Sequence, residues 1–291
     1  MPGMKKSCAL RGAKRSINSS AYYIVEKAGK GKTVNGNRVK KRIFAGSTAD
    51  QIVYTSFSRT EGGTKEPRIR FKNEEERAEH NRQVARRHCA RLINTNCTPA
   101  GYYCTLTFDN EHELHTFEEA RKIRSNFRRR LLYRCPEARV FIFMGRGKST
   151  SRIHFHVIAE NVTPEAIANA WTGGEIVEIK HLRANNKIKD ENGERDIGAD
   201  FTAVSNYCFD HWTPEQGGHY YCRAGDIRQP EEEEPTICIR EYSLTNPPLP
   251  PKGYVLVSSY ATSYGFLYFH YVKKPVPKGR KSNLQTFNIK C

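Results

Sequence analysis

Residues 138–159, ARVFIFMGRGKSTSRIHFHVIA, are the most informative segment of the chain about its fold. Two runs within it, 138–144 and 152–159, are rich in aromatic and β-branched residues, which favour strands. The short segment between them contains two glycines and is typical of a turn. This pattern predicts two antiparallel strands joined by a hairpin turn.

The second of these strands carries two histidines on one face. Side chains alternate between the two faces of a strand, so Ile153, Phe155 and Val157 share one side. His154 and His156 share the other side. We expect the apolar side to pack on helices and the histidines to stand on the open face of the sheet. Two imidazoles at this spacing can bind one metal ion, although an isolated pair is also typical of a solvated sheet face.

Segments on either side of the hairpin complete a β-α-β-β-α-β order over residues 101–182. A strand at 101–108, GYYCTLTF, precedes a helix that begins with a capping box at Thr116. After the histidine strand, Thr163 and the proline behind it start a short helix, and residues 175–181 form a fourth strand. This order predicts an α+β fold of the ferredoxin-like split βαβ type, with one antiparallel sheet and two helices on one face.

One further helix is predicted over residues 199–212, ADFTAVSNYCFDHW. Tyr207 and His211 lie four residues apart and therefore project from the same side of this helix. If that side covers the histidine pair, the tyrosine hydroxyl lies beside a bound cation. A tyrosine oxygen can act as a covalent nucleophile, and a metal ion can polarise a phosphoryl oxygen. These residues suggest phosphodiester transesterification with Tyr207 as the nucleophile. The alternative is that Tyr207 only packs in the fold.

The chain falls into three predicted parts. Residues 1–94 form a basic N-terminal arm and a helix, residues 95–245 form the main domain, and residues 246–291 form a proline-rich linker, a β-rich extension and a basic tail. Residues 1–72 hold 17 Lys or Arg and 4 Asp or Glu, which is +13 of the net +17 of the 291-residue chain. Basic arms of this kind commonly bind phosphate backbones. The alternative interpretation is that residues 1–72 only make the protein more soluble.

Three segments are less well defined by their pattern. Residues 21–72 contain short β-like runs that fit either a small hairpin or an extended arm. The polar stretch 183–198 has no predicted strand or helix. The acidic run 231–234 is typical of a solvated loop.

The composition excludes several classes of protein. The nine cysteines are scattered and form no CxxC pair, which argues against a zinc ribbon or a thioredoxin-like site and suits a reducing compartment. No apolar run reaches the ~18 residues of a membrane-spanning helix, and the N-terminus lacks the apolar core of a signal peptide. We therefore expect a cytoplasmic protein with no membrane partner.

Three segments resemble motifs one, two and three of the HUH endonucleases and occur in the same order. They are YYCTLTFD at 102–109, RIHFHVIA at 152–159 and NYCFDHW at 206–212. More specifically, the chain resembles the rolling-circle replication initiators, or Rep proteins, of bacterial plasmids, phages and integrative elements. The resemblance covers about residues 95–275.

The resemblance implies a mechanism and partners. His154 and His156 would hold Mg²⁺ or Mn²⁺, and Tyr207 would attack one phosphodiester of single-stranded or hairpin origin DNA. That step would leave a covalent 5′-phosphotyrosine and a free 3′-OH that primes synthesis. The chain has no ATPase motif, so we expect a host helicase and a DNA polymerase to act with it.

The sequence does not identify the third metal ligand. Members of this family often use an acidic residue on the strand before the histidines, and this chain has none there. Glu160 shares the histidine face but lies ~13 Å along the strand, at ~3.3 Å per residue, which is too far. Asp109, His112 and Asp210 are candidates. His211 stands where many relatives have lysine or a second tyrosine, and we expect it to assist catalysis as an acid, a base or a phosphate partner.

Two groups of residues are candidates for DNA contact. The first group lies around the hairpin turn and consists of Arg146, Lys148 and Arg152. These residues can contact DNA phosphates, or they can simply face solvent in an exposed turn. The second group follows the tyrosine helix and fits either DNA contact or packing: Tyr220, Tyr221, Arg223 and Arg228. The two tyrosines of the second group are also rival nucleophiles.

The sequence is also compatible with two other classes of function. A mobilisation relaxase or a tyrosine (HUH) transposase would use the same chemistry on different DNA. A ferredoxin-like RNA- or ssDNA-binding module would not be an enzyme, and it normally presents aromatic residues where this chain has His154 and His156. Metal-dependent cleavage separates the enzymes from the module, and a covalent adduct separates tyrosine nicking from ordinary metal hydrolysis.

Overall fold

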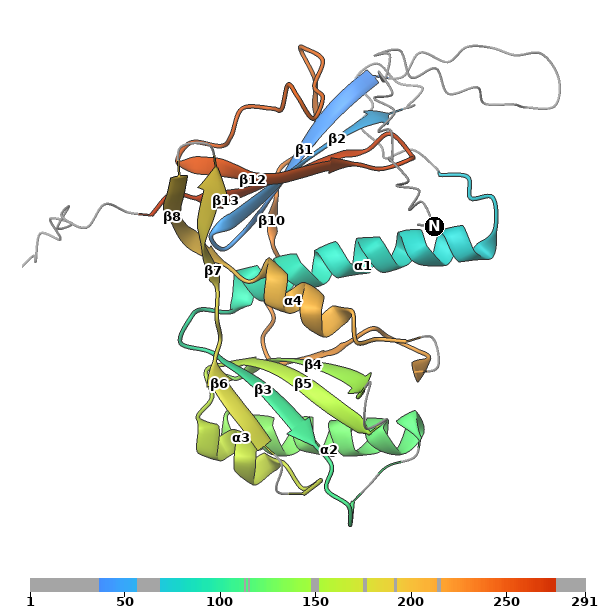
Figure 1. Cartoon of the computed structure of the whole chain (residues 1–291), viewed down its shortest axis with the longest axis vertical. Helices are drawn as coiled ribbons and strands as arrows, with labels where there is room; N and C mark the ends of the chain where they lie inside the picture. Colours follow the sequence, from blue (N-terminus) through green and yellow to red (C-terminus); the bar gives the residue numbers. More distant parts are fainter. Residues whose placement is uncertain are drawn as a thin grey trace, which may run out of the picture.

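A computed structural model of the chain shows four layers (Figure 1). From top to bottom of that view they are a sheet, a layer of two helices, a second sheet and another layer of two helices. The expected α+β fold with antiparallel sheets is confirmed. No helix in the described part of the chain has the length and apolar character needed to cross a bilayer. The structure describes residues 37–56, 69–112, 114, 116–147, 152–174, 177–190, 193–213 and 216–275.

The lower sheet contains the hairpin that carries the two histidines. In order across the sheet, its strands are β6 (Val177–His181), β3 (Tyr102–Thr107), β5 (Ile153–Glu160), β4 (Arg139–Arg146) and β9 (Cys222–Ala224). All neighbouring strands pair antiparallel. The histidine strand β5 is therefore in the centre of the sheet, flanked by β3 and β4.

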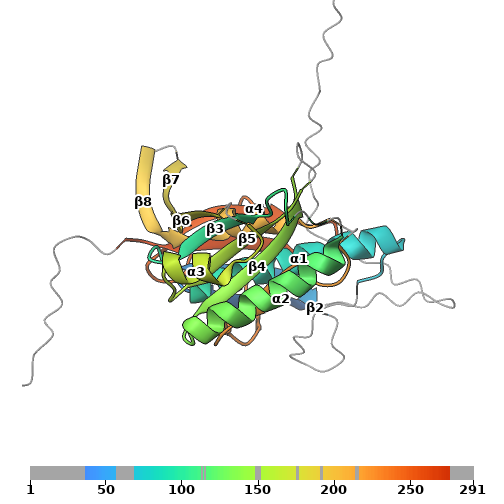
Figure 2. The ribbon, with the colours of Figure 1, turned by 90° about the horizontal axis from the view of Figure 1, so that it is seen from below.

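Two helices cover the outer face of the lower sheet, α2 (Phe117–Arg134) and α3 (Pro164–Ala170), which lie nearest the viewer in Figure 2. Both begin as predicted, α2 with a capping box at Thr116 and α3 with Thr163 as its N-cap. The apolar side of β5, with the fully buried Phe155 at its centre, packs in the core between the sheet and these helices. The predicted direction of the two faces of this strand is confirmed.

The inner face of the lower sheet is covered by α1 (Glu74–Asn96) and α4 (Thr202–Phe209). Their apolar side chains form a second core with Phe141 and Phe143 of β4 and Ile158 of β5. The sheet face that holds the histidines therefore has a helical cover. Strand β4 is buried on both sides, because its alternate residues face the two cores.

A hairpin precedes α4 in the polar stretch where the sequence predicted neither strand nor helix. It consists of β7 (Asn185–Asp190) and β8 (Gly193–Asp200), and it projects beyond the edges of the sheets (Figure 2), while β8 also contacts β13 and β2 of the upper sheet. Most of its side chains are polar and exposed, so the apolar alternation that reveals a half-buried strand is missing. Because β8 extends to Asp200, α4 begins at Thr202 rather than at the predicted residue 199.

The upper sheet joins the two ends of the described chain. In order its strands are β10 (Glu231–Glu232), β1 (Asn37–Ala45), β2 (Thr48–Ser56), β13 (Leu267–Lys273) and β12 (Tyr254–Ala261), and β11 (Thr236–Ile237) also pairs with β1. Residues 37–56 thus form a hairpin. The acidic run predicted as a loop supplies β10, because its backbone pairs with the edge of β1.

The turn between β1 and β2 packs against the C-terminal end of α1. Gly46 in this turn has a φ of 59°, a conformation that favours glycine. A Cβ atom at this position would lie 2.0 Å from the carbonyl oxygen of Asn94. The absence of a side chain therefore permits the close approach of the upper sheet to the helical layer.

An ionic cluster also connects these layers. Asp50 of β2 accepts from Arg91 of α1 at 2.6 Å and from His270 of β13 at 2.8 Å, and His270 reaches Asp200 at the end of β8 at 3.1 Å. Burial acts to lower the pKa of His270, but hydrogen bonds and charge interactions with Asp200 and Asp50 outweigh it and raise this pKa to about 10. His270 is therefore an imidazolium at neutral pH.

Candidate active site

The candidate site lies where α4 crosses the inner face of the lower sheet. Strand β5 presents His154 and His156 on this face, and His154 pairs with Gly145 of the neighbouring strand β4. Tyr207 lies within α4, and His211 follows the last residue of that helix by two positions. The strand period places the first pair of side chains. Helix α4 places Tyr207, and the turn that follows it places His211, because the helix ends at Phe209 rather than at the predicted residue 212. Packing of α4 on the sheet brings the two pairs together.

Three histidines form a cluster on this face. The Nε2 atoms of His154 and His156 lie 3.0 Å apart. The ring centroid of His211 lies 4.3 Å from that of His156 and 5.7 Å from that of His154. One nitrogen from each ring lies within 4.8 Å of the other two, and His156 is only 3% exposed. These three side chains can therefore hold a metal ion.

The third member of the cluster was not expected as a ligand. The sequence left that ligand open among Asp109, His112 and Asp210, and it assigned His211 a helper role. In the structure His112 pairs with Asp109 at 2.7 Å, and Asp210 pairs with Arg86 at 2.7 Å. The Asp109 carboxylate is therefore hydrogen-bonded to His112, the Asp210 carboxylate is in an ion pair, and the turn after α4 brings an imidazole to the cluster instead.

Hydrogen bonds orient two of the rings toward a common centre. The Nδ1 atom of His156 lies 2.7 Å from the hydroxyl oxygen of Tyr103. The Nδ1 atom of His211 lies 2.8 Å from the carbonyl oxygen of Tyr207 and donates to it. With Nδ1 protonated, each ring keeps its Nε2 lone pair for a metal ion. Partners of this kind fix the tautomer and orientation of metal-binding histidines, so the donor set fits a metal centre.

Burial keeps the histidine pair uncharged at neutral pH. It lowers the pKa of His156 to about 3, with added repulsion from His154 and His211. It also lowers the pKa of His154, although a hydrogen bond to the Arg152 backbone opposes the effect. Neutral imidazole is the form that binds metal, so binding here does not need to displace protons from this pair at pH 7.

Tyr207 stands beside the cluster with its side chain 54% exposed. Its ring centroid lies 5.5 Å from that of His156 and 4.7 Å from that of His211. The hydroxyl of Tyr103, which contacts Nδ1 of His156, accepts from Thr105 at 3.4 Å. A tyrosine that solvent can reach therefore lies next to three histidine nitrogens that can hold a metal ion, the arrangement expected from the spacing of Tyr207 and His211.

Two residues shape the walls of the site. A Cβ atom at Gly145 would lie 3.0 Å from Cβ of His211 and 3.1 Å from Nε2 of His154, so glycine at this position leaves room for both rings. Gln216 is 1% exposed, and its side-chain amide donates to the carbonyl oxygens of Met144 at 3.0 Å and of His211 at 3.1 Å. These bonds tie the segment that follows α4 to strand β4.

Tyr103 and Gln216 contact the histidine cluster, and the sequence pattern did not identify them as site residues. For Tyr103 a signal was present, because Cys104 and Leu106 are the apolar positions of the same strand and leave Tyr103 on the histidine face. For Gln216 no local signal exists. It lies outside the helix and reaches β4 only in the folded chain.

The basic residues of the hairpin turn lie at one end of the lower sheet. The guanidinium of Arg146 lies 5.1 Å from the ring centroid of Phe117, at the start of α2. Arg152 donates a hydrogen bond to Asn110. Lys148 is outside the described residues. The two described arginines thus interact with the segments before and at the start of α2.

The second group of predicted DNA contacts lies beyond α4. Tyr220 and Tyr221 stack on phenylalanines of α4 and β4, with ring centroids 4.9 and 5.6 Å apart. Both tyrosines pack at the edge of the inner core. Arg223 is exposed on β9, and Arg228 hydrogen-bonds to the C-terminal turn of α1. The ring contacts of Tyr220 and Tyr221 are with this core rather than with the histidines.

The site as a whole is a three-histidine cluster with an exposed tyrosine at its edge. Hydrogen bonds with the Tyr103 hydroxyl and to the Tyr207 carbonyl set the direction of two imidazoles. Gln216 holds the loop that bears His211. Comparisons of the chain with protein-family models, with curated proteins and with solved structures found no match.

Proposed function

We propose that this chain is a metal-dependent, single-stranded DNA nicking and joining enzyme of the HUH type that initiates rolling-circle replication. The observation that carries the proposal is the position of Tyr207 against the three histidines. Cleavage of a phosphodiester by a tyrosine is assisted by a cation at the scissile phosphate, and the DNA needs access to the hydroxyl. The cluster and the exposed side chain suit these two needs.

The topology of the lower sheet supports the proposal. The strand order β6-β3-β5-β4, with α2 and α3 on one face, supports the expected ferredoxin-like split βαβ arrangement. The resemblance to HUH endonucleases implies this arrangement. Many unrelated proteins share it, so the site rather than the fold carries the argument. An RNA-binding module would use aromatic residues on an open sheet face, whereas here α1 and α4 cover that face.

In the proposed reaction, the hydroxyl oxygen of Tyr207 attacks the phosphorus of one phosphodiester. The bond between phosphorus and the 3′ oxygen breaks as the tyrosyl bond forms, which leaves a 5′-phosphotyrosine and a 3′-OH. The tyrosine proton passes to solvent, which reaches the exposed side chain, and the 3′ oxygen takes up a proton from solvent. Joining is the reverse reaction, in which a 3′-OH attacks the phosphotyrosine and releases Tyr207.

The Nε2 atoms of His154, His156 and His211 would hold the cation. Bound there, a divalent ion supplies Lewis-acid polarisation of the scissile phosphate. Of the two ions that the resemblance implies, Mn²⁺ suits three imidazoles better, because Mg²⁺ prefers oxygen ligands and keeps several waters. We therefore expect the protein to bind Mn²⁺ more tightly than Mg²⁺.

A covalent adduct on a denaturing gel tests the proposal. The protein is incubated with Mn²⁺ and labelled single-stranded oligonucleotides from its own replicon. We expect a labelled protein–DNA adduct with the wild type and none with Tyr207→Phe, because phenylalanine has no nucleophilic oxygen. The double variant His154→Ala/His156→Ala should also give no adduct, because it removes two of the three nitrogens that can bind the cation.

Tyr133→Phe is the matched control, since this tyrosine is 85% exposed on α2, away from the cluster. It should form the adduct at the wild-type level. An adduct that persists in Tyr207→Phe contradicts the nucleophile assignment. Tight binding without cleavage of any substrate contradicts the enzymatic function. A relaxase or transposase would give the same adduct at a transfer origin or a transposon end, so the substrate that reacts separates these from a replication initiator.

A further inference from the structure

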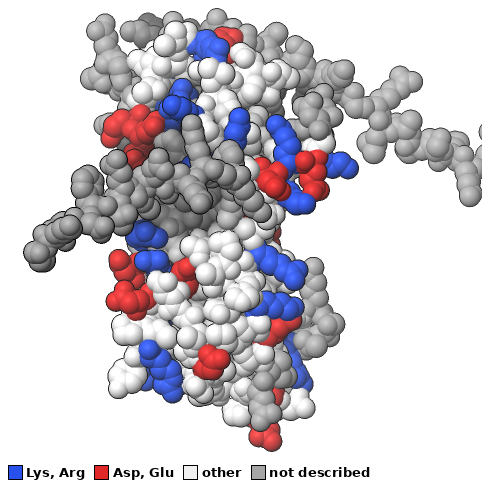
Figure 3. All heavy atoms as spheres, turned by 90° about the vertical axis from the view of Figure 1, so that its left-hand side faces the viewer, with Lys and Arg blue, Asp and Glu red and all other residues white. Residues whose placement is uncertain are grey.

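Helix α2 carries a high concentration of positive charge on the side of the lower sheet opposite the histidine cluster (Figure 1). Between Ala120 and Pro136 the sequence has seven Lys or Arg residues and no Asp or Glu. On the side of the molecule shown in Figure 3, by contrast, blue and red side chains are interspersed. Like charges three or four residues apart on a helix repel one another, so this helix retains a destabilising arrangement.

Three of these arginines form a stripe along the side of α2 that faces β9. Arg121, Arg124 and Arg128 are spaced by three and four residues. Arg121 donates to the carbonyl oxygen of Gln216, and Arg128 lies 3.9 Å from the sulfur of Cys222. Among the residues that the structure describes, no carboxylate lies within ion-pair distance of these three guanidinium groups. Their charge is therefore not compensated within the described fold.

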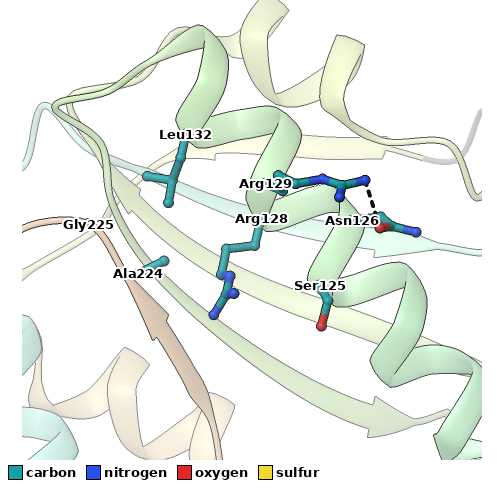
Figure 4. Close-up of a pocket in the computed structure, with 7 residues that line it drawn as sticks. All are labelled: Ser125, Asn126, Arg128, Arg129, Leu132, Ala224 and Gly225. Carbon is teal, nitrogen blue, oxygen red and sulfur yellow. Dashed lines mark hydrogen bonds between the residues drawn. The ribbon is translucent and has the colours of Figure 1, made fainter.

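An open groove of about 520 Å³ lies between α2 and β9 (Figure 4). Arg128 points from the helix toward the strand, next to Ala224. Arg129 donates to the side-chain oxygen of Asn126 at 3.3 Å, and Ser125 adds a hydroxyl to the same wall. The residues that line the groove are cationic, polar or small aliphatic, and none has an aromatic ring.

We propose that this groove binds the phosphate backbone of a DNA duplex. Arginine, serine and asparagine side chains are the groups that contact phosphates, and a polyanion relieves the repulsion along the stripe. A site for single strands combines cations with rings on which bases stack, and the lining lacks such rings. A duplex keeps its bases stacked inside and presents only its backbone. The lining therefore favours the double-stranded form.

The groove also has a direct structural connection to the candidate active site. Arg121, at one end of the stripe, donates to Gln216, and Gln216 donates to the carbonyl oxygen of His211. From Arg121 to Arg128 the helix rises ~10.5 Å, about the axial length of three base steps of one duplex strand. A hairpin stem in the groove would thus run away from the site while its single-stranded flank enters it. The choice of DNA as ligand rests on the proposed function.

The salt dependence of duplex binding tests this assignment. Binding of a labelled 20-base-pair duplex is followed by fluorescence anisotropy in EDTA over a series of salt concentrations, so that no cleavage occurs. The variant is Arg124→Gln/Arg128→Gln/Arg129→Gln. Its control, Lys180→Gln/Lys187→Gln/Lys189→Gln, removes the same number of charges from exposed positions of β6 and β7. Circular dichroism melting verifies that both variants fold.

We expect the arginine variant to bind at least about tenfold more weakly than the control and its salt slope to fall by about 2 to 3, since each lost phosphate contact removes ~0.9. Equal slopes for the two variants overturn the proposal. A loss confined to a single-stranded oligonucleotide overturns the assignment of a duplex. Adduct formation by Tyr207 is measured separately on a short single strand and should persist in the arginine variant. If the wild type also forms no adduct, the nicking function is rejected, while the duplex-binding measurement still tests the groove.

Discussion

Tyr103 acts on the histidine cluster through one hydroxyl group, so its contribution can be separated from those of the proposed ligands. Its oxygen lies 2.7 Å from Nδ1 of His156, and its ring stacks on that imidazole at an interplanar angle of 18°. Burial raises the pKa of Tyr103, so the hydroxyl stays neutral and protonated at neutral pH. The contact of the hydroxyl with Nδ1 therefore orients the His156 ring so that Nε2 points toward His154.

Removing this hydroxyl should weaken metal binding while leaving the fold intact. We expect Tyr103→Phe to lower the affinity for Mn²⁺ by about 10- to 100-fold, the usual effect of losing a partner behind a metal-binding histidine. Tyr102→Phe is the control, because Tyr102 is on the other face of β3 and stacks on His181. Isothermal titration calorimetry with Mn²⁺ measures both. Equal affinities for the two variants would show that the hydroxyl does not orient the ligand.

Among the elements, the β1–β2 hairpin and helix α1 determine how the upper sheet meets the rest of the molecule. The hairpin turn touches α1 through Gly46, and Arg91 of α1 pairs with Asp50 of β2. On its other side, α1 packs with α4 over the lower sheet. Helix α1 therefore connects the upper sheet to the helix that carries Tyr207.

Gly46→Ala should be markedly destabilising. The substitution combines a strained positive φ with a Cβ atom placed 2.0 Å from the carbonyl oxygen of Asn94. Gly253→Ala is the matched control, because it has a φ of 83° and open space around the added atom. We expect a loss of about 3 kcal/mol or more for Gly46→Ala and of about 1 kcal/mol for the control. Urea denaturation measures both, and equal losses would mean that the turn moves away from α1 without cost.

At the scale of the whole molecule, the four layers place the candidate active site between α4 and the lower sheet, with the ionic cluster on the opposite side of the helical layer. Asp50, Arg91, Asp200 and His270 come from four different elements of the fold. Burial acts to raise the pKa of Asp50, but Arg91 and His270 outweigh it and lower this pKa to about 2. The cluster is therefore fully charged at neutral pH and depends on the assembly of the layers.

The pH dependence of stability should reveal this cluster. The pKa of His270 is about 10 in the folded chain and about 6.5 when unfolded, so its contribution is complete below pH 6.5 and is lost as the pH rises toward 10. We expect the free energy of unfolding to fall by about 2 kcal/mol between pH 6.5 and 8.5. The lowered pKa values of His154 and His156 act only below pH 6.5, outside this window.

Denaturant unfolding at these two pH values tests the assignment. His270→Gln should be less stable than wild type at pH 6.5 and should lose most of the pH dependence. His219→Gln is the control, because this histidine is exposed, and it should keep the wild-type slope. A wild-type free energy of unfolding that does not change between pH 6.5 and 8.5 would contradict the raised pKa of His270.

Local sequence pattern was enough to predict the order β-α-β-β-α-β, the face of β5 that bears His154 and His156, and the common side of Tyr207 and His211. These features follow from local periodicity and capping, which depend on residues a few positions apart. The strands β7 and β8 in residues 185–200 were not predicted, because an exposed polar hairpin has no alternation of apolar and polar residues.

Other features arise only when the chain folds. Folding joins residues 37–56 with residues 254–273 in one sheet, brings His211 into the histidine cluster and places Tyr103 behind His156. These contacts depend on strand register and on the packing of α4, which arise from interactions between distant segments. The local sequence pattern does not predict these interactions, because many strand registers and helix packings are compatible with the same periodicity.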